Sequence, residues 1–177
     1  MIEIIPKLTL NCDQRRRHGY VTAARRSLSR SLVLSRISYN DVIYHDVPAY
    51  LINRLQRVQL AAASFVIGKY ANMTDLLKLG WLPVSHNREL NLCKLTFKAL
   101  HCINWPPYLR LEVRVPPRAL RSSSSLNLVV PRISGILQDC AARVFNNLPD
   151  NIKKCEDFNT FKKKCKSHLT EQAKTDI

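Results

Sequence analysis

The sequence predicts a mainly α-helical protein, and three features of the chain point to this fold class. In several segments, apolar residues recur every three or four positions, which is the spacing of one face of an α-helix. Only four of the 177 residues are glycine, which is few for a fold built from many tight β-turns. The nine prolines cluster between the periodic segments. We expect a small helical bundle at residues 22–103, a Pro/Ser-rich connector at 104–134 that can form a short β-hairpin, and a C-terminal helical cap at 135–177.

Residues 1–21 differ from the rest of the chain. Residues 1–10 are mostly apolar and can form a short strand, and residues 15–18 are the basic run RRRH. Such a segment is either a solvated, poorly ordered terminus or an arm that contacts phosphates or acts as a nuclear-localisation-like signal. We place it outside the bundle as a basic N-terminal arm.

The bundle is predicted to begin with three helices, at residues 22–35, 40–45 and 49–67. In the first, Ala24, Leu28 and Leu32 recur every four residues and predict one apolar stripe. The second is expected to end before Pro48, because a residue that precedes proline is pushed away from helical angles. The third has the clearest pattern, and Gly68 is a plausible terminator. Its core-facing seam is predicted to contain Leu51, Leu55, Val58, Ala62 and Phe65, with Asn53, Arg57 and Ser64 on the opposite flank.

Two further helices are predicted at residues 74–79 and 87–103. Gly80 is expected to end the shorter one, after which Trp81 is predicted to enter the core rather than to stack on a nucleic-acid base. The longer helix is expected to bury Leu92, Cys93, Thr96, Phe97, Ala99 and Leu100. Its polar row consists of Asn91, Lys94, Lys98 and His101, which can follow a phosphate strand or form an ordinary solvated face.

The connector at residues 104–134 contains five prolines and the serine run 122–125. Residues 126–130 can pair with residues 111–115 as a hairpin. Serine hydroxyls beside arginines can bind phosphate oxygens, although a flexible linker has the same composition. The arginines of this segment are Arg110, Arg114, Arg118, Arg121 and Arg132.

The C-terminal cap is predicted to contain two helical parts separated by a turn at Pro149. The first packs Ile136, Leu137 and Ala141 with Val144, Phe145 and Leu148. The second begins at Asp157 and turns Phe158, Phe161, Cys165 and Leu169 inward. Lys162, Lys163, Lys164 and Lys166 are expected to face water, where they also suit the helix dipole.

The formal net charge of +15 is the main indication of a partner. This excess is spread along the chain, which suits a surface that follows a polyanion better than it suits one small anion pocket. Nucleic-acid phosphate is the commonest dense anion. The composition therefore favours RNA or DNA as a partner, with an acidic membrane surface or an acidic protein as the alternatives.

The cysteine pattern predicts reduced thiols in an intracellular protein of the nucleus or cytoplasm. The six cysteines form no CxxC pair and no regular disulfide framework, and no secretory leader is expected. Cys165 and His168 have the spacing of a ligand pair, but a zinc site needs four ligands and no second pair has suitable spacing. We therefore expect no metal, no cofactor and no small-molecule substrate. No apolar run approaches the roughly 20 residues of a membrane span.

Several segments, taken in order, resemble one region of a known enzyme family. The first three are SRISYN (35–40), PAYLINRLQRVQLAAA (48–63) and GWLPV (80–84). LTFKALH (95–101), PPYL (106–109), LRSSSSL with VPR (120–132) and AARVFNNLPDNI (141–152) follow in the same order. This succession resembles the segment just downstream of the polymerase core in non-LTR, LINE-like retrotransposon reverse transcriptases. Ala142 and Phe145 stand where the family has Pro and Trp, and both are compatible with packing.

The resemblance implies a thumb-like helical unit that grips the template–primer duplex behind a polymerase active site. Its partners would be RNA, DNA or an RNA–DNA hybrid, bound through phosphates and sugars with little regard to sequence. An alternative is a protein-interaction module that docks onto a separate polymerase core or another acidic partner. The residues predicted to contact phosphates are first Arg57, Lys94 and Lys98, and then Arg25, Arg26, Arg30 and Arg121.

The catalytic residues of such a polymerase are missing from this sequence. Reverse transcription needs a cluster of aspartates that hold two divalent metal ions, and the family supplies them from a Tyr-x-Asp-Asp hairpin and an upstream Asp. The only adjacent acidic pair here is Glu156 and Asp157, which lies where a lysine-rich helix begins and is predicted to cap it. We therefore expect no catalytic residue, and no enzyme activity from this chain alone.

Overall fold

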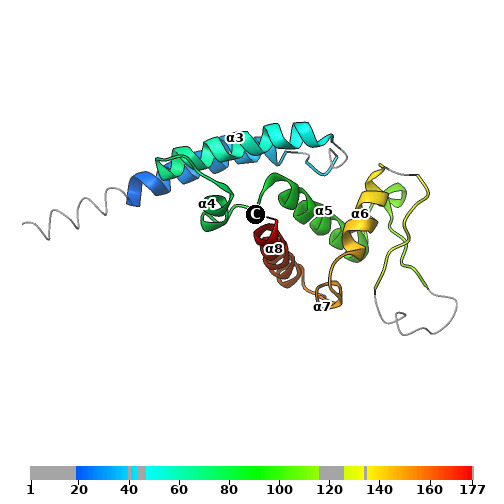
Figure 1. Ribbon diagram of the computed structural model, residues 1–177. Helices are drawn as coiled ribbons and strands as arrows, with labels where there is room; N and C mark the ends of the chain where they lie inside the picture. The colour runs from blue at the N-terminus through cyan, green and yellow to red at the C-terminus, as the bar shows by residue number, and fades with distance from the viewer. Residues whose placement is uncertain (1–18, 40, 44–46, 116–125, 134, 177) are drawn as a thin grey trace, which may run out of the picture.

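The computed structural model describes residues 19–39, 41–43, 47–115, 126–133 and 135–176, and these residues are mainly helical, as predicted (Figure 1). The predicted arm at residues 1–18 and the serine run 122–125 lie outside the described residues, as do Arg118 and Arg121. A helix over residues 19–28 is followed by η1 (Ser29–Leu34), α2 (Ser35–Ile37), α3 (Ala49–Ile67), α4 (Met73–Lys78), α5 (Val84–His101), η2 (Pro107–Leu109), α6 (Leu137–Asn146), α7 (Asp150–Lys153) and α8 (Phe158–Thr175).

The first helical segment runs unbroken over residues 19–37, but its predicted apolar stripe is wrong. Leu28 and Leu32 are 51% and 66% exposed, and Ala24 is exposed as well. Ser29 is buried instead, and Val33 packs against the core formed with α3 and α4. The reason is that η1 is a π-helical turn, whose hydrogen bonds span five residues rather than four and therefore rotate the face that meets α3.

The helix predicted at residues 40–45 is also wrong where the structure describes it. Asp41–Ile43 form a turn, and residues 40 and 44–46 lie outside the described part. The carboxylate of Asp41 accepts a hydrogen bond from the Asn91 side chain of α5 and is buried. A tertiary contact therefore decides the local conformation here.

The third helix, α3, has the predicted bounds, and Gly68 ends it with a left-handed φ of 81°. The predicted seam is only partly correct, since Ala62 is buried whereas Val58 and Phe65 are about half exposed. The seam is displaced because a polar residue occupies its centre. Gln59 is buried and donates from Nε2 to the Leu82 carbonyl at 2.8 Å.

The short helix α4 and the segment after it close the smaller of the two main cores. Asn72 and Asp75 form a capping box at the start of α4, and Gly80 ends the turn after it with a φ of 70°. Trp81 is 5% exposed and packs in this core, as predicted.

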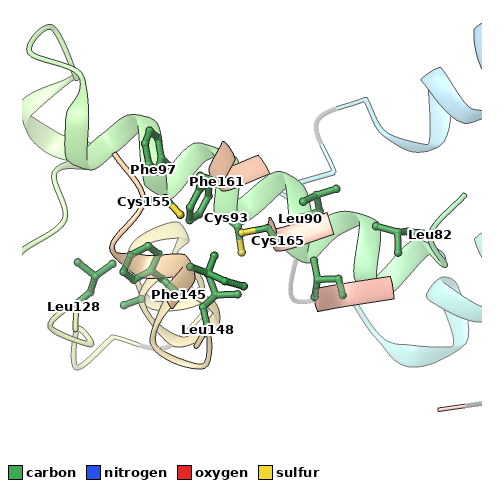
Figure 2. Close-up of a cluster of buried hydrophobic side chains, with 13 residues drawn as sticks. Leu82, Leu90, Cys93, Phe97, Leu128, Phe145, Leu148, Cys155, Phe161 and Cys165 are labelled. Atoms are coloured by element: carbon green, nitrogen blue, oxygen red, sulfur yellow. The ribbon is translucent and has the colours of Figure 1, made fainter. Parts of the chain in front are cut away.

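The larger core surrounds α5, which packs against α6 and α8 on one side and α3 on the other. Figure 2 shows Phe97 of α5 beside Phe161 of α8, and their ring centroids are 4.7 Å apart. Cys93 and Cys165 meet at the same interface, and their hydrogen bond together with burial raises the pKa of the Cys93 thiol. This core crosses the predicted boundary at residue 103, although the division into units stays a prediction.

The connector contributes one antiparallel bridge, between Val113 and Leu128. The Arg114 amide donates to the Asn127 carbonyl at 2.8 Å beside it. The Asn146 side chain of α6 pairs with both the amide and the carbonyl of Leu128, at 2.7 and 3.0 Å. This amide acts as a short third strand and fixes the buried Leu128 against the larger core.

The inward-facing residues of the cap agree with the prediction. Phe145, Phe161, Cys165 and Leu169 are at most 2% exposed. Asp157 caps α8 by accepting from the Thr160 amide at 2.7 Å. The four lysines of the predicted row, Lys162, Lys163, Lys164 and Lys166, are exposed.

Phe161→Ala is expected to destabilise the protein by about 3–5 kcal/mol, because it removes a fully buried ring from the α5–α8 interface. The free energy of unfolding from chemical denaturation measures this cost. Tyr70→Ala, at a 99% exposed position, is the control and should change stability by no more than about 0.5 kcal/mol. A cost below about 1 kcal/mol for Phe161→Ala would mean that this interface does not hold the fold together.

Candidate functional site

Three lysines from two helices lie close together on the surface of the larger core. Lys94 and Lys98 are one turn apart on α5, and Lys162 projects from the adjacent α8. The charge of Lys162 acts on Lys94 directly, as does that of Lys98. We call Lys94, Lys98 and Lys162 the lysine cluster.

The pKa of Lys94 lies below its ordinary value of 10.5, and its surroundings explain why. Burial of the half-buried side chain is the largest cause, and repulsion from Lys162 is the next. Asp41 opposes this shift by attraction, and Lys98 adds to it. Like charges are thus held together with incomplete compensation from the protein itself.

The packing of α5 on α8 places these ammonium groups. Phe97 and Phe158 are in ring contact at 5.7 Å between α5 and α8. The Lys98 ammonium lies 5.5 Å from the centre of the Phe158 ring, within the range of a cation–π contact. An aromatic contact that belongs to the core therefore also fixes one member of the cluster.

Asp41 is the acid that partly balances Lys94. Burial raises the pKa of Asp41, while hydrogen bonding from Asn91 and the charge of Arg88 act in the opposite direction. Because this carboxylate is only 3% exposed and is engaged by Asn91, it partly compensates the cluster from beneath. The outer side of the cluster is left to solvent or to a bound anion.

The structure brings together only part of the predicted contact set. Lys94 and Lys98 belong to the cluster, whereas Arg57 is exposed elsewhere on α3. Arg25 lies 5.5 Å from the Phe65 ring, and Arg26 donates to the Leu79 carbonyl, so both fasten residues 19–28 to the rest of the bundle. Arg121 lies outside the described residues, and Arg30 borders a cavity considered below.

Sequence reasoning missed Lys162 and Lys166 as members of a site and explained them by the helix dipole. Their spacing of four residues places them on one face of α8, just as Lys94 and Lys98 share a face of α5. That repeated spacing was the available signal. Only the packing of α5 on α8 shows that the two faces adjoin.

Other kinds of site receive no support from the described residues. Among them, no three His, Cys, Asp or Glu side chains gather in a way that could hold a metal ion. No helix within the same ranges has the length and apolar character needed to cross a membrane. Cys165 is buried against Cys93 rather than directed toward a ligand set with His168.

Comparisons with known proteins give no relative: no protein-family model, curated protein or solved structure matches this chain. Function is therefore inferred from the geometry of the site and from the resemblance of the sequence segments.

Lys162→Gln is expected to move the pKa of Lys94 upward toward 10.5, because it removes a repelling positive charge. A pH titration of the lysine side-chain resonances by NMR measures the shift. Asp41→Asn should move the same pKa further down, since it removes an attracting charge. If the pKa of Lys94 does not respond to Lys162→Gln, the two ammonium groups are not neighbours.

Lys94→Met is expected to leave the melting temperature unchanged or slightly higher near neutral pH. The folded protein lowers the pKa of Lys94, so the protonated form costs stability below that pKa. This cost fades as the pH rises through the folded value toward 10.5, and the difference between variant and parent should fade with it. A clear loss of melting temperature at neutral pH would show that Lys94 serves the fold instead.

Proposed function

We propose that this chain binds the backbone of RNA, DNA or an RNA–DNA hybrid, as a thumb-like C-terminal part of a LINE-type reverse transcriptase. The observation that carries the proposal is the lysine cluster, in which Lys94, Lys98 and Lys162 hold like charges together across two helices. The order of the resembling sequence segments is the second support, and it supplies the family.

A polyanion is the ligand that relieves this arrangement best. Successive turns of α5 put Lys94 and Lys98 about 6 Å apart along the helix axis, so a row of phosphates can meet both. Binding restores the favourable charged state of Lys94, because each phosphate supplies the attraction that Asp41 supplies only in part. Ammonium groups on flexible side chains act as point charges and confer little base preference.

The proposal includes binding without catalysis. Asp157 is committed to the Thr160 amide at the start of α8, and Glu156 is exposed beside it. Nothing in the sequence supplies the aspartate cluster that the resembling polymerases use. The polymerase core would be a separate part, and this chain would hold the nucleic acid that it copies.

An alternative function is that of a module that docks onto such a polymerase core. The observation that favours it is the apolar outer side of residues 19–37. Tyr20, Val21, Leu28 and Leu32 are 46–76% exposed there. Large apolar side chains that gather on one element mark a contact surface more often than scattered ones do.

We expect a fluorescent duplex or hybrid oligonucleotide to bind the protein at about 50 mM salt, with log affinity falling linearly against log salt. Replacing Lys94, Lys98 and Lys162 together with Gln should weaken all sequences alike. The salt slope should become shallower by about 0.9 for each phosphate that the variant no longer neutralises. Fluorescence anisotropy measures both quantities.

A matched triple variant, Lys69→Gln with Lys154→Gln and Lys174→Gln, removes the same charge elsewhere on the surface. It should retain most of the affinity, because these lysines lie after α3, after α7 and in the last turn of α8. Equal losses for both triple variants would mean that net charge alone, and not the lysine cluster, drives binding. A changed base preference would reject backbone contact.

The alternative is separated by Leu28→Glu with Leu32→Glu, two exposed changes on the first helical segment. This variant should bind oligonucleotide as the parent does if the lysine cluster is the site. Pull-down with a LINE-type polymerase core tests docking. Docking that this variant abolishes, with no oligonucleotide binding by the parent, would favour the interaction module over the proposed function.

A further inference from the structure

A cavity of about 400 Å³ opens where the first helical segment, α3, α5 and α8 come together. Three cationic side chains border it, namely Arg30 from η1 and Lys162 and Lys166 from α8. No aspartate or glutamate is among its described lining residues. The opening is therefore a concave, positively charged site distinct in shape from the exposed lysine cluster.

A buried donor borders the same cavity. Trp81 is 5% exposed, and its Nε1 has no hydrogen-bond partner among the described residues. Leaving a buried N–H group unpaired is unfavourable, and an oxygen atom from a ligand would satisfy it. This gives the cavity a polar requirement that packing alone does not explain.

The remaining walls are mixed in character. Leu34, Leu82 and Leu90 provide apolar surface, while Ser38 and Asn87 provide polar groups and hydrogen-bond to each other at 3.1 Å. A bare anion has no use for the apolar part. A volume of about 400 Å³ lies at the lower end of sites for small organic ligands, roughly 300–1,000 Å³.

We propose that this cavity binds one nucleotide, with its phosphate between Arg30, Lys162 and Lys166 and its base against Trp81 and the leucines. Cations suit the phosphate, and aromatic and apolar surface suits the flat face of a base. The inference rests on the proposed function, because Lys162 belongs both to the lysine cluster and to the cavity. A strand held on the cluster would thus place an unpaired nucleotide in the cavity.

Trp81 can report occupancy in the full chain. The only other tryptophan, Trp105, donates to the Leu109 carbonyl in the connector, and Trp105→Phe leaves Trp81 as the single emitter. This protein is titrated with adenosine 5′-monophosphate, inorganic phosphate and a short single-stranded oligonucleotide. We expect saturable changes in Trp81 emission with the nucleotide, the oligonucleotide or both, and weaker binding of inorganic phosphate.

Two substitutions test the cations without touching the shared Lys162. Arg30→Gln and Lys166→Gln should each weaken the ligand that changes Trp81 emission by roughly tenfold, the size of one charge-assisted hydrogen bond. Lys163→Gln is the matched control, since it removes the same charge one position along α8 from a residue that does not line the cavity. It should leave the titration unchanged. Circular dichroism verifies that each variant is folded.

The outcomes separate this inference from the proposed function. A response to the mononucleotide alone assigns the cavity to free nucleotides, and a response to the oligonucleotide alone assigns it to a strand. Oligonucleotide binding by anisotropy without any change in Trp81 emission overturns the cavity and leaves the lysine cluster standing. Equal affinity for phosphate and nucleotide, or equal weakening by Lys163→Gln, also overturns the nucleotide site.

Discussion

The packing of α5 against α8 is the interaction on which both the fold and the site depend. Phe97 and Phe161 meet in the middle of it, and Cys93 and Cys165 lie beside them (Figure 2). Burial of such side chains supplies the main stabilisation of a small helical protein. The same contact sets the polar outer faces of the two helices next to each other, so core packing creates the cationic surface.

This coupling explains why the site tolerates repulsion. The lysines of the cluster project from helices whose inner faces are fully buried, and the core outweighs the small cost of like charges at a partly solvated surface. Asp41 reduces that cost from below without neutralising it. Stability thus comes from the apolar faces, and the remaining positive potential is free to attract an anion.

The sequence was sufficient to predict the helical class, the bounds of α3 and the inward faces of α6 and α8, because each depends on local periodicity and capping. It failed for the stripe of Leu28 and Leu32, since the π-helical turn changes the phase of the helix. It also failed to see that Gln59 takes a core position through its bond to the Leu82 carbonyl. Within the site, Lys94 and Lys98 could be predicted from one helix, whereas Lys162 required knowledge of which helices pack together.

The most direct test of the account is to observe lysine side chains by NMR while a hybrid oligonucleotide is added to the full chain. The account predicts that the resonances of Lys94, Lys98 and Lys162 shift first and together, and that those of Lys69, Lys154 and Lys174 scarcely move. Shifts spread evenly over all lysines, or confined to lysines outside the cluster, would contradict it.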